Sequence, residues 1–171
     1  MSEQRAAHTS PPDAQAIAKR FAAVESAQQQ PREIILRCRP DGVRELCAAL
    51  RNEYGFDYLA DLCGADCPEL RVVIRLYCTA RKDYVRISVP LDRAAPVAPS
   101  LTSLWPAANW QEREAYDLFG IRFEGHPDLR RILLPLDWQG HPLLREPKAA
   151  AEQPAQSETA PVPPAQSEAA A

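Results

Sequence analysis

The chain has 171 residues, and 46% of them are hydrophobic, which is enough for the core of one modest domain plus flexible ends. Its 20 basic and 23 acidic residues give a formal net charge of −3 and are spread along the chain. No sustained basic face is therefore available to neutralise phosphates, and a nucleic-acid partner is not expected.

Neither a signal peptide nor a membrane span is predicted. Residues 1–16 mix charged residues with prolines and lack the apolar stretch of a signal peptide. No uninterrupted apolar run approaches the roughly 18 to 20 residues that cross a bilayer. The sequence therefore predicts a cytoplasmic protein, which can attach to a membrane only through its partners.

The five cysteines are expected to be reduced thiols, because an odd number in an intracellular chain does not form a disulfide framework. Cys63 and Cys67 are separated by three residues, but a zinc site would need a second such pair or a pair of histidines. Cys38, Cys47 and Cys78 fall on apolar positions and should pack as small hydrophobes.

The first predicted element is an amphipathic helix within residues 1–30. An aspartate after two prolines is a suitable N-cap. Ile17, Phe21 and Val24 then recur at i, i+4 and i+7, which predicts a narrow apolar stripe on a helix that ends within residues 28–31.

Residues 31–104 are predicted to form an α+β domain. A short strand is expected at residues 33–38, and a second helix follows a proline and an aspartate and ends at Gly55. The apolar face of this helix is the best patterned in the chain and should face the core; it consists of Val43, Leu46, Cys47 and Leu50.

Three further strands are expected, the first of them at residues 56–63. In the other two, apolar and polar residues alternate. The apolar positions are Val72, Ile74, Leu76, Cys78, Val85, Ile87 and Val89, and the polar positions expected to face water are Arg71, Arg75, Arg86 and Ser88. Residues 79–83 between these strands suit a hairpin, so the pair should be antiparallel. The predicted fold is α+β, with a small sheet of about four strands, one or two helices on one face, and the other face solvated or covered by another protein.

The chain changes character after residue 94, where prolines interrupt any long element. Residues 105–147 are predicted to form an extended arm with short helices. Residues 148–171 are mainly alanine, proline, serine, glutamine and glutamate, and contain Pro-Ala-Gln-Ser-Glu twice. Such a tail cannot bury enough apolar surface to offset the entropy of ordering it, so it is predicted to be disordered.

One helix is predicted within the arm. Asn109 is a candidate N-cap and Glu112 stands where it would complete a capping box. Arg113 and Asp117 are spaced for an ion pair on the helix surface, and Gly120 ends the helix. A short extended piece should follow it, and then a Gly-His-Pro-Asp turn that caps a brief stretch before a second Gly-His-Pro.

These residues resemble the signature of a known family. The signature residues are Asn-Trp-Gln-Glu-Arg-Glu-Ala-Tyr-Asp-Leu-Phe-Gly-Ile at 109–121, Gly-His-Pro-Asp-Leu-Arg-Arg-Ile-Leu at 125–133 and Asp-Trp-Gln-Gly-His-Pro-Leu at 137–143. This pattern is similar to that of the so-called 30 kDa subunit of the membrane-bound NADH-quinone oxidoreductases (complex I). The order of elements from residue 17 onwards agrees, and a match over about thirty-five residues is far more specific than a short motif.

The chain departs from the family pattern after Leu143. The family usually continues with Arg-Lys-Asp-Tyr-Pro, whereas Leu144, Arg145, Glu146 and Pro147 stand here. In the family this end continues as an arm along the quinone-proximal subunit, so the resemblance leaves the last contacts of this chain open.

The resemblance implies a non-catalytic structural subunit in the peripheral arm of a proton-translocating NADH-quinone oxidoreductase. Such a subunit braces the quinone-site subunit and neighbouring iron-sulfur subunits during electron transfer from NADH to quinone. Other subunits would bind NADH, FMN, iron-sulfur clusters and quinone, and this chain would carry no cofactor, metal or catalytic residue. Its expected location is peripheral, on the cytoplasmic side of the cell membrane.

The candidate functional residues bind partners. Aromatic residues interleaved with arginine are typical of interface cores, and the resemblance favours docking over an ordinary solvated helix face. The predicted docking residues are Trp110, Glu112, Arg113, Glu114, Tyr116, Asp117, Phe119, Gly120, His126, Pro127, Asp128, Arg130, Arg131, Trp138, His141 and Pro142. Both histidines precede proline in turns and lack the spacing of metal ligands.

Two alternatives stay open at this point. The nearer one is the equivalent subunit of a membrane-bound hydrogenase or of a complex with another electron donor, which neighbouring genes would distinguish. The more distant one is a metal enzyme with cysteine and histidine ligands, for which bound zinc or iron near one equivalent would be decisive.

Overall fold

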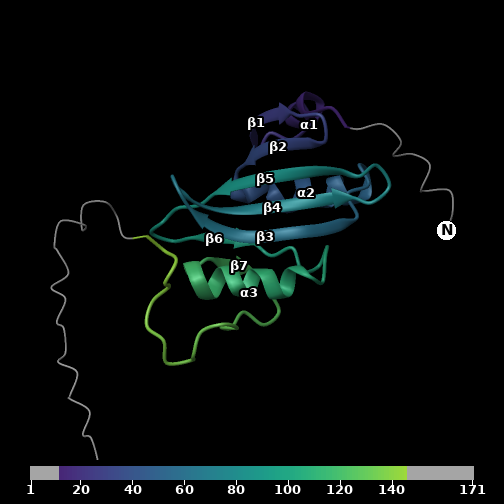
Figure 1. The fold of residues 1–171 in the computed structure, drawn as a ribbon. Helices are drawn as coiled ribbons and strands as arrows, with labels where there is room; N and C mark the ends of the chain where they lie inside the picture. Colours follow the sequence, from purple (N-terminus) through teal and green to yellow (C-terminus); the bar gives the residue numbers. More distant parts are fainter. Residues whose placement is uncertain (1–11, 146–171) are drawn as a thin grey trace, which may run out of the picture.

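A computed structural model describes residues 12–145. Its elements are α1 (Ala14–Arg20), β1 (Val24–Gln29), β2 (Glu33–Cys38), a 3-10 turn η2 (Pro40–Gly42), α2 (Val43–Asn52), β3 (Tyr58–Asp66), β4 (Leu70–Cys78), β5 (Asp83–Pro90), β6 (Val97–Pro99), α3 (Ala108–Phe119) and β7 (Arg122–Glu124). A five-stranded sheet has the order β1-β2-β5-β4-β3, and β6 and β7 pair separately (Figure 1). The α+β class is confirmed, with one strand more than expected.

The order of the strands places a parallel pair inside a mostly antiparallel sheet. β4 and β5 form the predicted antiparallel hairpin, while β2 pairs with β5 in parallel. Parallel neighbours need a crossover connection. Here α2, β3 and β4 together form that connection, which carries α2 behind the sheet in Figure 1.

The N-terminal helix is shorter than predicted. α1 ends at Arg20, and Phe21 already has extended backbone, with φ −109° and ψ 103°. Val24 begins β1 and pairs with Cys38 of β2. The predicted helix to residues 28–31 is therefore wrong, because a stripe of only three apolar residues does not determine the period and the hydrogen bonds to β2 decide the conformation.

The predicted core face of α2 is confirmed. Val43, Leu46, Cys47 and Leu50 are each at most 1% exposed. The alternating apolar residues of β4 and β5 are buried too, so both periodicities face one hydrophobic core. The backbone of Gly55, shortly after α2, has a φ of 72°, which glycine adopts without strain.

Leu46→Asp or Val43→Asp is expected to unfold the domain, because either change buries a charge without a partner. Circular dichroism would measure the loss of structure. Arg44→Asp is the control, since Arg44 is exposed on the same helix. If Leu46→Asp were as stable as that control, the assigned core face of α2 would be incorrect.

The segment predicted as an arm begins with a helix packed on the sheet. Ala108 and Ala115 of α3 belong to the same core as the strands. The ring of Phe119 lies where a Cβ on Gly64 of β3 would be, so glycine is needed there. Residues 129–134 contain no helix, and the predicted disordered tail at 148–171 lies outside the described residues. The division of the chain into four segments stays a prediction.

Candidate docking site

Residues 126–145, which we call the strap, follow β7 and run along α3 without regular secondary structure (Figure 1). A segment without a helix or strand makes no repeating backbone hydrogen bonds of its own. Its shape therefore depends on the contacts that hold it to α3 and to the sheet.

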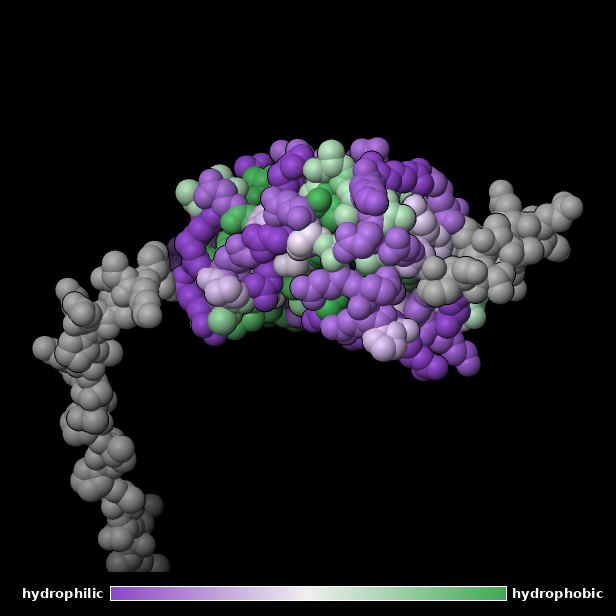
Figure 2. Space-filling view, turned by 90° about the horizontal axis from the view of Figure 1, so that it is seen from above, coloured by the Kyte–Doolittle hydropathy of each residue, from purple (hydrophilic) through white to green (hydrophobic). Residues whose placement is uncertain are grey.

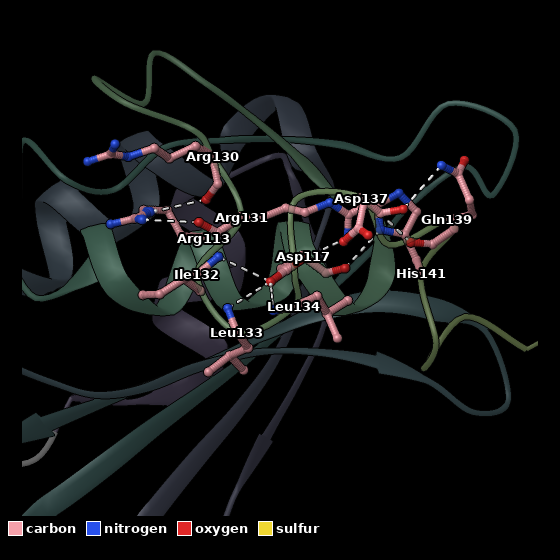
Figure 3. Close-up of polar contacts among 11 residues, drawn as sticks. Arg113, Asp117, Arg130, Arg131, Ile132, Leu133, Leu134, Asp137, Gln139 and His141 are labelled. Carbon is pink, nitrogen blue, oxygen red and sulfur yellow. Dashed lines mark hydrogen bonds and ion pairs between the residues drawn. The ribbon is translucent and has the colours of Figure 1, made fainter.

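Asp117 is the centre of these contacts (Figure 3). Its side chain is fully buried, and one carboxylate oxygen, Oδ2, accepts hydrogen bonds from three consecutive backbone N–H groups. They belong to Ile132, Leu133 and Leu134, at 3.1, 2.9 and 2.9 Å. The other oxygen, Oδ1, accepts a hydrogen bond from Nη1 of Arg131 at 2.7 Å. One carboxylate thus determines the path of four successive strap residues.

The charge of Asp117 is stabilised by these donors. Burial by itself would raise the pKa of the carboxyl group, because it removes the charged form from water. The backbone N–H groups of residues 132–134 and the guanidinium of Arg131 outweigh that effect and hold the pKa below its usual value. Asp117 is therefore ionised in the folded chain at neutral pH.

Arg113 holds the strap one turn earlier on α3. Its Nε donates to the carbonyl of Arg130 at 3.1 Å, and its Nη2 donates to the carbonyl of Arg131 at 3.3 Å. The guanidinium carbon also lies 5.2 Å from the ring centre of Trp110. The predicted surface ion pair between Arg113 and Asp117 is therefore wrong, because both side chains are used by the strap.

His126 attaches the beginning of the strap to α3. Its Nδ1 accepts a hydrogen bond from the N–H of Asp128 at 3.0 Å, so that nitrogen carries no proton. The protonated Nε2 then donates to the carbonyl of Asn109 at 3.2 Å. Asn109 is thus inside the helix, whose N-cap is Ala107, and the predicted N-cap is wrong.

His141 attaches the strap to the other end of α3. Its Nδ1 donates to the carbonyl of Asp117 at 2.9 Å, and the N–H of Leu143 donates to the carbonyl of Leu118 at 3.0 Å. These contacts satisfy carbonyl groups that the end of a helix leaves without partners. The predicted helix end at Gly120 is confirmed, with a φ of 74°.

The last described residue of the strap returns to the sheet. The N–H of Arg145 donates to Oδ2 of Asp66, at the end of β3, at 2.7 Å. Arg93 joins the two, since it pairs with Asp66 and donates to the carbonyl of Arg145. The strap is consequently held at both ends and in the middle.

Glu112 faces the interior and not the solvent. Its side chain is fully buried, and its Oε1 accepts a hydrogen bond from the N–H of Leu101 at 2.6 Å. Burial raises the pKa of Glu112 to about 7, and the Leu101 N–H and the Ser100 hydroxyl offset only part of that effect. The predicted capping box is wrong, because this carboxylate ties α3 to the loop before it.

The structure divides the predicted docking residues into three groups. The buried ones are Glu112, Arg113 and Asp117; the partly exposed ones are Tyr116, Phe119, Gly120, His126, Arg131 and His141; the exposed ones are Trp110, Glu114, Pro127, Asp128, Arg130, Trp138 and Pro142. The buried three contact their own chain, which corrects the expectation that they lie on the outer helix face. A docking role for the remaining residues stays a prediction.

Three exposed leucines, Leu133, Leu136 and Leu143, were not among the predicted docking residues. Apolar residues in a segment rich in glycine and proline were the available signal, because such a segment has no helical face to bury them. Asp66 and Arg93 were also missed, since nothing in the sequence connects them with the strap.

The described residues also bear on metal binding and membrane insertion. Residues 12–145 contain no group of three or more histidine, cysteine, aspartate or glutamate side chains placed to hold a metal ion. Cys63 and Cys67 are exposed thiols, while Cys38, Cys47 and Cys78 are buried as expected. Within the same residues, no helix is both long and apolar enough to cross a membrane.

Comparisons with known proteins agree with the family resemblance. The family model described as the 30 Kd subunit of the respiratory-chain NADH dehydrogenase matches residues 36–153. The corresponding NADH-quinone oxidoreductase subunit of Moorella thermoacetica is 49% identical over 109 residues, which are 62% of this chain and 74% of that protein. The one from a Roseiflexus species is 42% identical over 121 residues, which are 67% of this chain and 70% of that protein.

Solved structures share the same fold. A trypsin-resistant fragment of Nqo5 superposes with a TM-score of 0.57 at 32% identity, covering 67% of this chain and 94% of the fragment. The membrane-bound sulfane sulfur reductase, an archaeal respiratory membrane complex, contains a chain with a TM-score of 0.57 at 21% identity and 72% coverage of both, which shows a common fold. The chain therefore belongs to the family of the 30 kDa subunit of the respiratory-chain NADH dehydrogenase, the NADH-quinone oxidoreductase.

Proposed function

We propose that the chain braces the quinone-site subunit and neighbouring iron-sulfur subunits in the peripheral arm of the complex. The chain contributes position and no chemistry of its own. Other subunits carry NADH, FMN, the iron-sulfur clusters and quinone, and this chain holds no catalytic residue or cofactor. It lies on the cytoplasmic side of the cell membrane and reaches the membrane through the complex.

The distribution of exposed apolar side chains is the observation that carries this proposal. Six large hydrophobic side chains are exposed among the described residues, and five of them lie on the first turn of α3 or on the strap. These five are between 46% and 89% exposed: Trp110, Leu133, Leu136, Trp138 and Leu143. Exposed apolar residues gathered on one segment are typical of a protein–protein interface.

The opposite end of the molecule has a different character. Figure 2 looks down on the molecule from the side of α1 and β1, and hydrophilic residues predominate there, with hydrophobic ones in small groups. Scattered apolar residues of this kind are ordinary for a protein surface. The strap is therefore the better candidate for docking.

The contacts of the strap support the bracing role. Because Asp117, Arg113 and the two histidines already hold its backbone, docking would cost little additional conformational entropy. A pre-ordered surface also transmits position, which matters where reacting groups must stay aligned. A displacement of about 1 Å can lower a reaction rate by about a hundredfold.

Leu133→Ser combined with Leu136→Ser should separate docking from folding. Both leucines are exposed, so the melting temperature of the isolated chain should stay within about 2 °C. The amount of chain recovered with the complex, purified through a tag on another subunit, should fall about tenfold or more, and NADH-driven quinone reduction should fall with it.

The matched control is Lys19→Ser combined with Asn52→Ser, which shortens two exposed side chains on α1 and α2. This variant should fold and be incorporated like the parent chain. Normal recovery of the double leucine variant in an active complex would show that the strap is ordinary surface, and would contradict the proposed docking site.

A further inference from the structure

The five-stranded sheet has a second face that no helix of residues 12–145 covers. Figure 1 shows the sheet from this side, with α2 behind it. We propose that this open face is a second docking surface, which binds a carboxylate-bearing surface of another subunit of the complex. The inference rests on the proposed bracing function, because a brace must bind neighbours on more than one side.

The register of the strands brings three tyrosines into one row on the open face. Tyr58 of β3 lies opposite Tyr77 of β4, which lies opposite Tyr84 of β5. The ring centres of Tyr77 and Tyr84 are 4.7 Å apart, and Tyr58 is 56% exposed. Tyrosine supplies a large, stiff contact area with a polar tip, and it is enriched where protein interfaces concentrate their binding energy.

Two arginines form the next row. Arg75 of β4 lies opposite Arg86 of β5, and its guanidinium carbon is 4.3 Å from the ring centre of Tyr84. Stacking on the ring holds the guanidinium in place beside the tyrosines. Tyrosine and arginine together have the composition expected of an interface core.

The hydrogen-bonding capacity of these arginines indicates what binds them. Both approach the same carboxylate, Glu33, at 3.5 and 3.4 Å. The side chain of Glu33 is 18% exposed, whereas those of Arg75 and Arg86 are 47% and 45% exposed, so the guanidinium groups lie outermost. Each guanidinium has five N–H donors in a planar fork that fits a carboxylate. The outward donors therefore suit aspartate or glutamate of a partner.

Two other occupants fit less well. A twofold contact with a second copy of this chain would set the same guanidinium groups against each other. Nucleic acid would need several cations in excess, whereas Glu33 and Asp61 balance Arg75 and Arg86 in these two rows. A neighbouring protein surface with apolar and acidic residues is the occupant that matches both rows.

Photo-crosslinking in the assembled complex tests the inference directly. Tyr58 is replaced by p-benzoylphenylalanine, a residue of similar shape, and a second variant carries it at Trp138 on the strap. After irradiation, mass spectrometry should find position 58 joined to another subunit, at a segment that contains aspartate or glutamate and differs from the segment joined to position 138.

The two positions separate this inference from the proposed function. Crosslinks from position 138 without any from position 58, or from position 58 to a second copy of this chain, would overturn the inference and leave the proposed function standing. The absence of crosslinks from both positions would count against both.

A pair of substitutions measures how much the arginines contribute. Arg75→Gln combined with Arg86→Gln should keep the fold, because both side chains are exposed, and should lower retention of the chain in the salt-washed complex about tenfold or more. The control is Arg44→Gln combined with Arg122→Gln, which removes two exposed guanidinium groups elsewhere. Equal retention of the two double variants would overturn the inference.

Discussion

Replacing Asp117 with alanine is expected to lower the free energy of unfolding by about 3 to 5 kcal/mol, because partners of a buried carboxylate are left unpaired. The partners in question are the guanidinium of Arg131 and the N–H groups of residues 132–134. Urea denaturation would measure the change. Trypsin should also cleave faster after Arg130 and Arg131, since the strap loses its central attachment.

Asp128→Ala is the matched control for this prediction. Asp128 lies on the same strap, but its carboxylate is exposed and pairs with the exposed Arg130, so its loss should cost less than about 1 kcal/mol. If Asp117→Ala were as stable and as resistant to trypsin as this control, the strap would be held by other contacts.

The lowered pKa of Asp117 also predicts how acid acts on the strap. A carboxyl group whose pKa is lower in the folded chain than its ordinary value of 3.8 contributes stability above that value. The contribution is lost as the pH falls through the folded pKa. The stability difference between the parent chain and Asp117→Asn should therefore shrink below about pH 4, which urea denaturation at several pH values would show.

Glu112→Gln is expected to remove a large dependence of stability on pH. The pKa of Glu112 is raised from 4.5 to about 7 in the folded chain, so folded chains bind a proton more readily than unfolded ones between these values. The stability that this group contributes should accordingly be fully present below pH 4.5 and be lost as the pH rises to about 7. The shift corresponds to roughly 3 kcal/mol, lost because an ionised carboxylate stays buried.

The comparison is one of slopes. Glutamine at position 112 would keep an oxygen for the N–H of Leu101 but cannot ionise, so the Glu112→Gln variant should lack this fall between pH 4.5 and 7. Glu114→Gln, at an exposed position of the same helix, should keep the slope of the parent. Equal slopes for parent and Glu112→Gln in urea denaturation would mean that Glu112 is ionised without cost.

Several parts of this protein follow from the sequence alone. The apolar stripe of α2 and the alternation in β4 and β5 were predictable because each is long enough to determine its period. The short connection between β4 and β5 excluded a crossover and required a hairpin. The family could be recognised because charged, aromatic and turn residues agree in register from residue 109 to residue 143.

Other parts were decided only by the tertiary structure. Three apolar residues did not distinguish helix from strand, so β1 depended on the hydrogen bonds that β2 offers. Glu112 and Asp117 have the same spacing on a helix whether water, a neighbouring subunit or their own chain faces them. The groups that bind these carboxylates are mainly backbone N–H groups, which every residue except proline carries and which therefore leave no signal in the sequence.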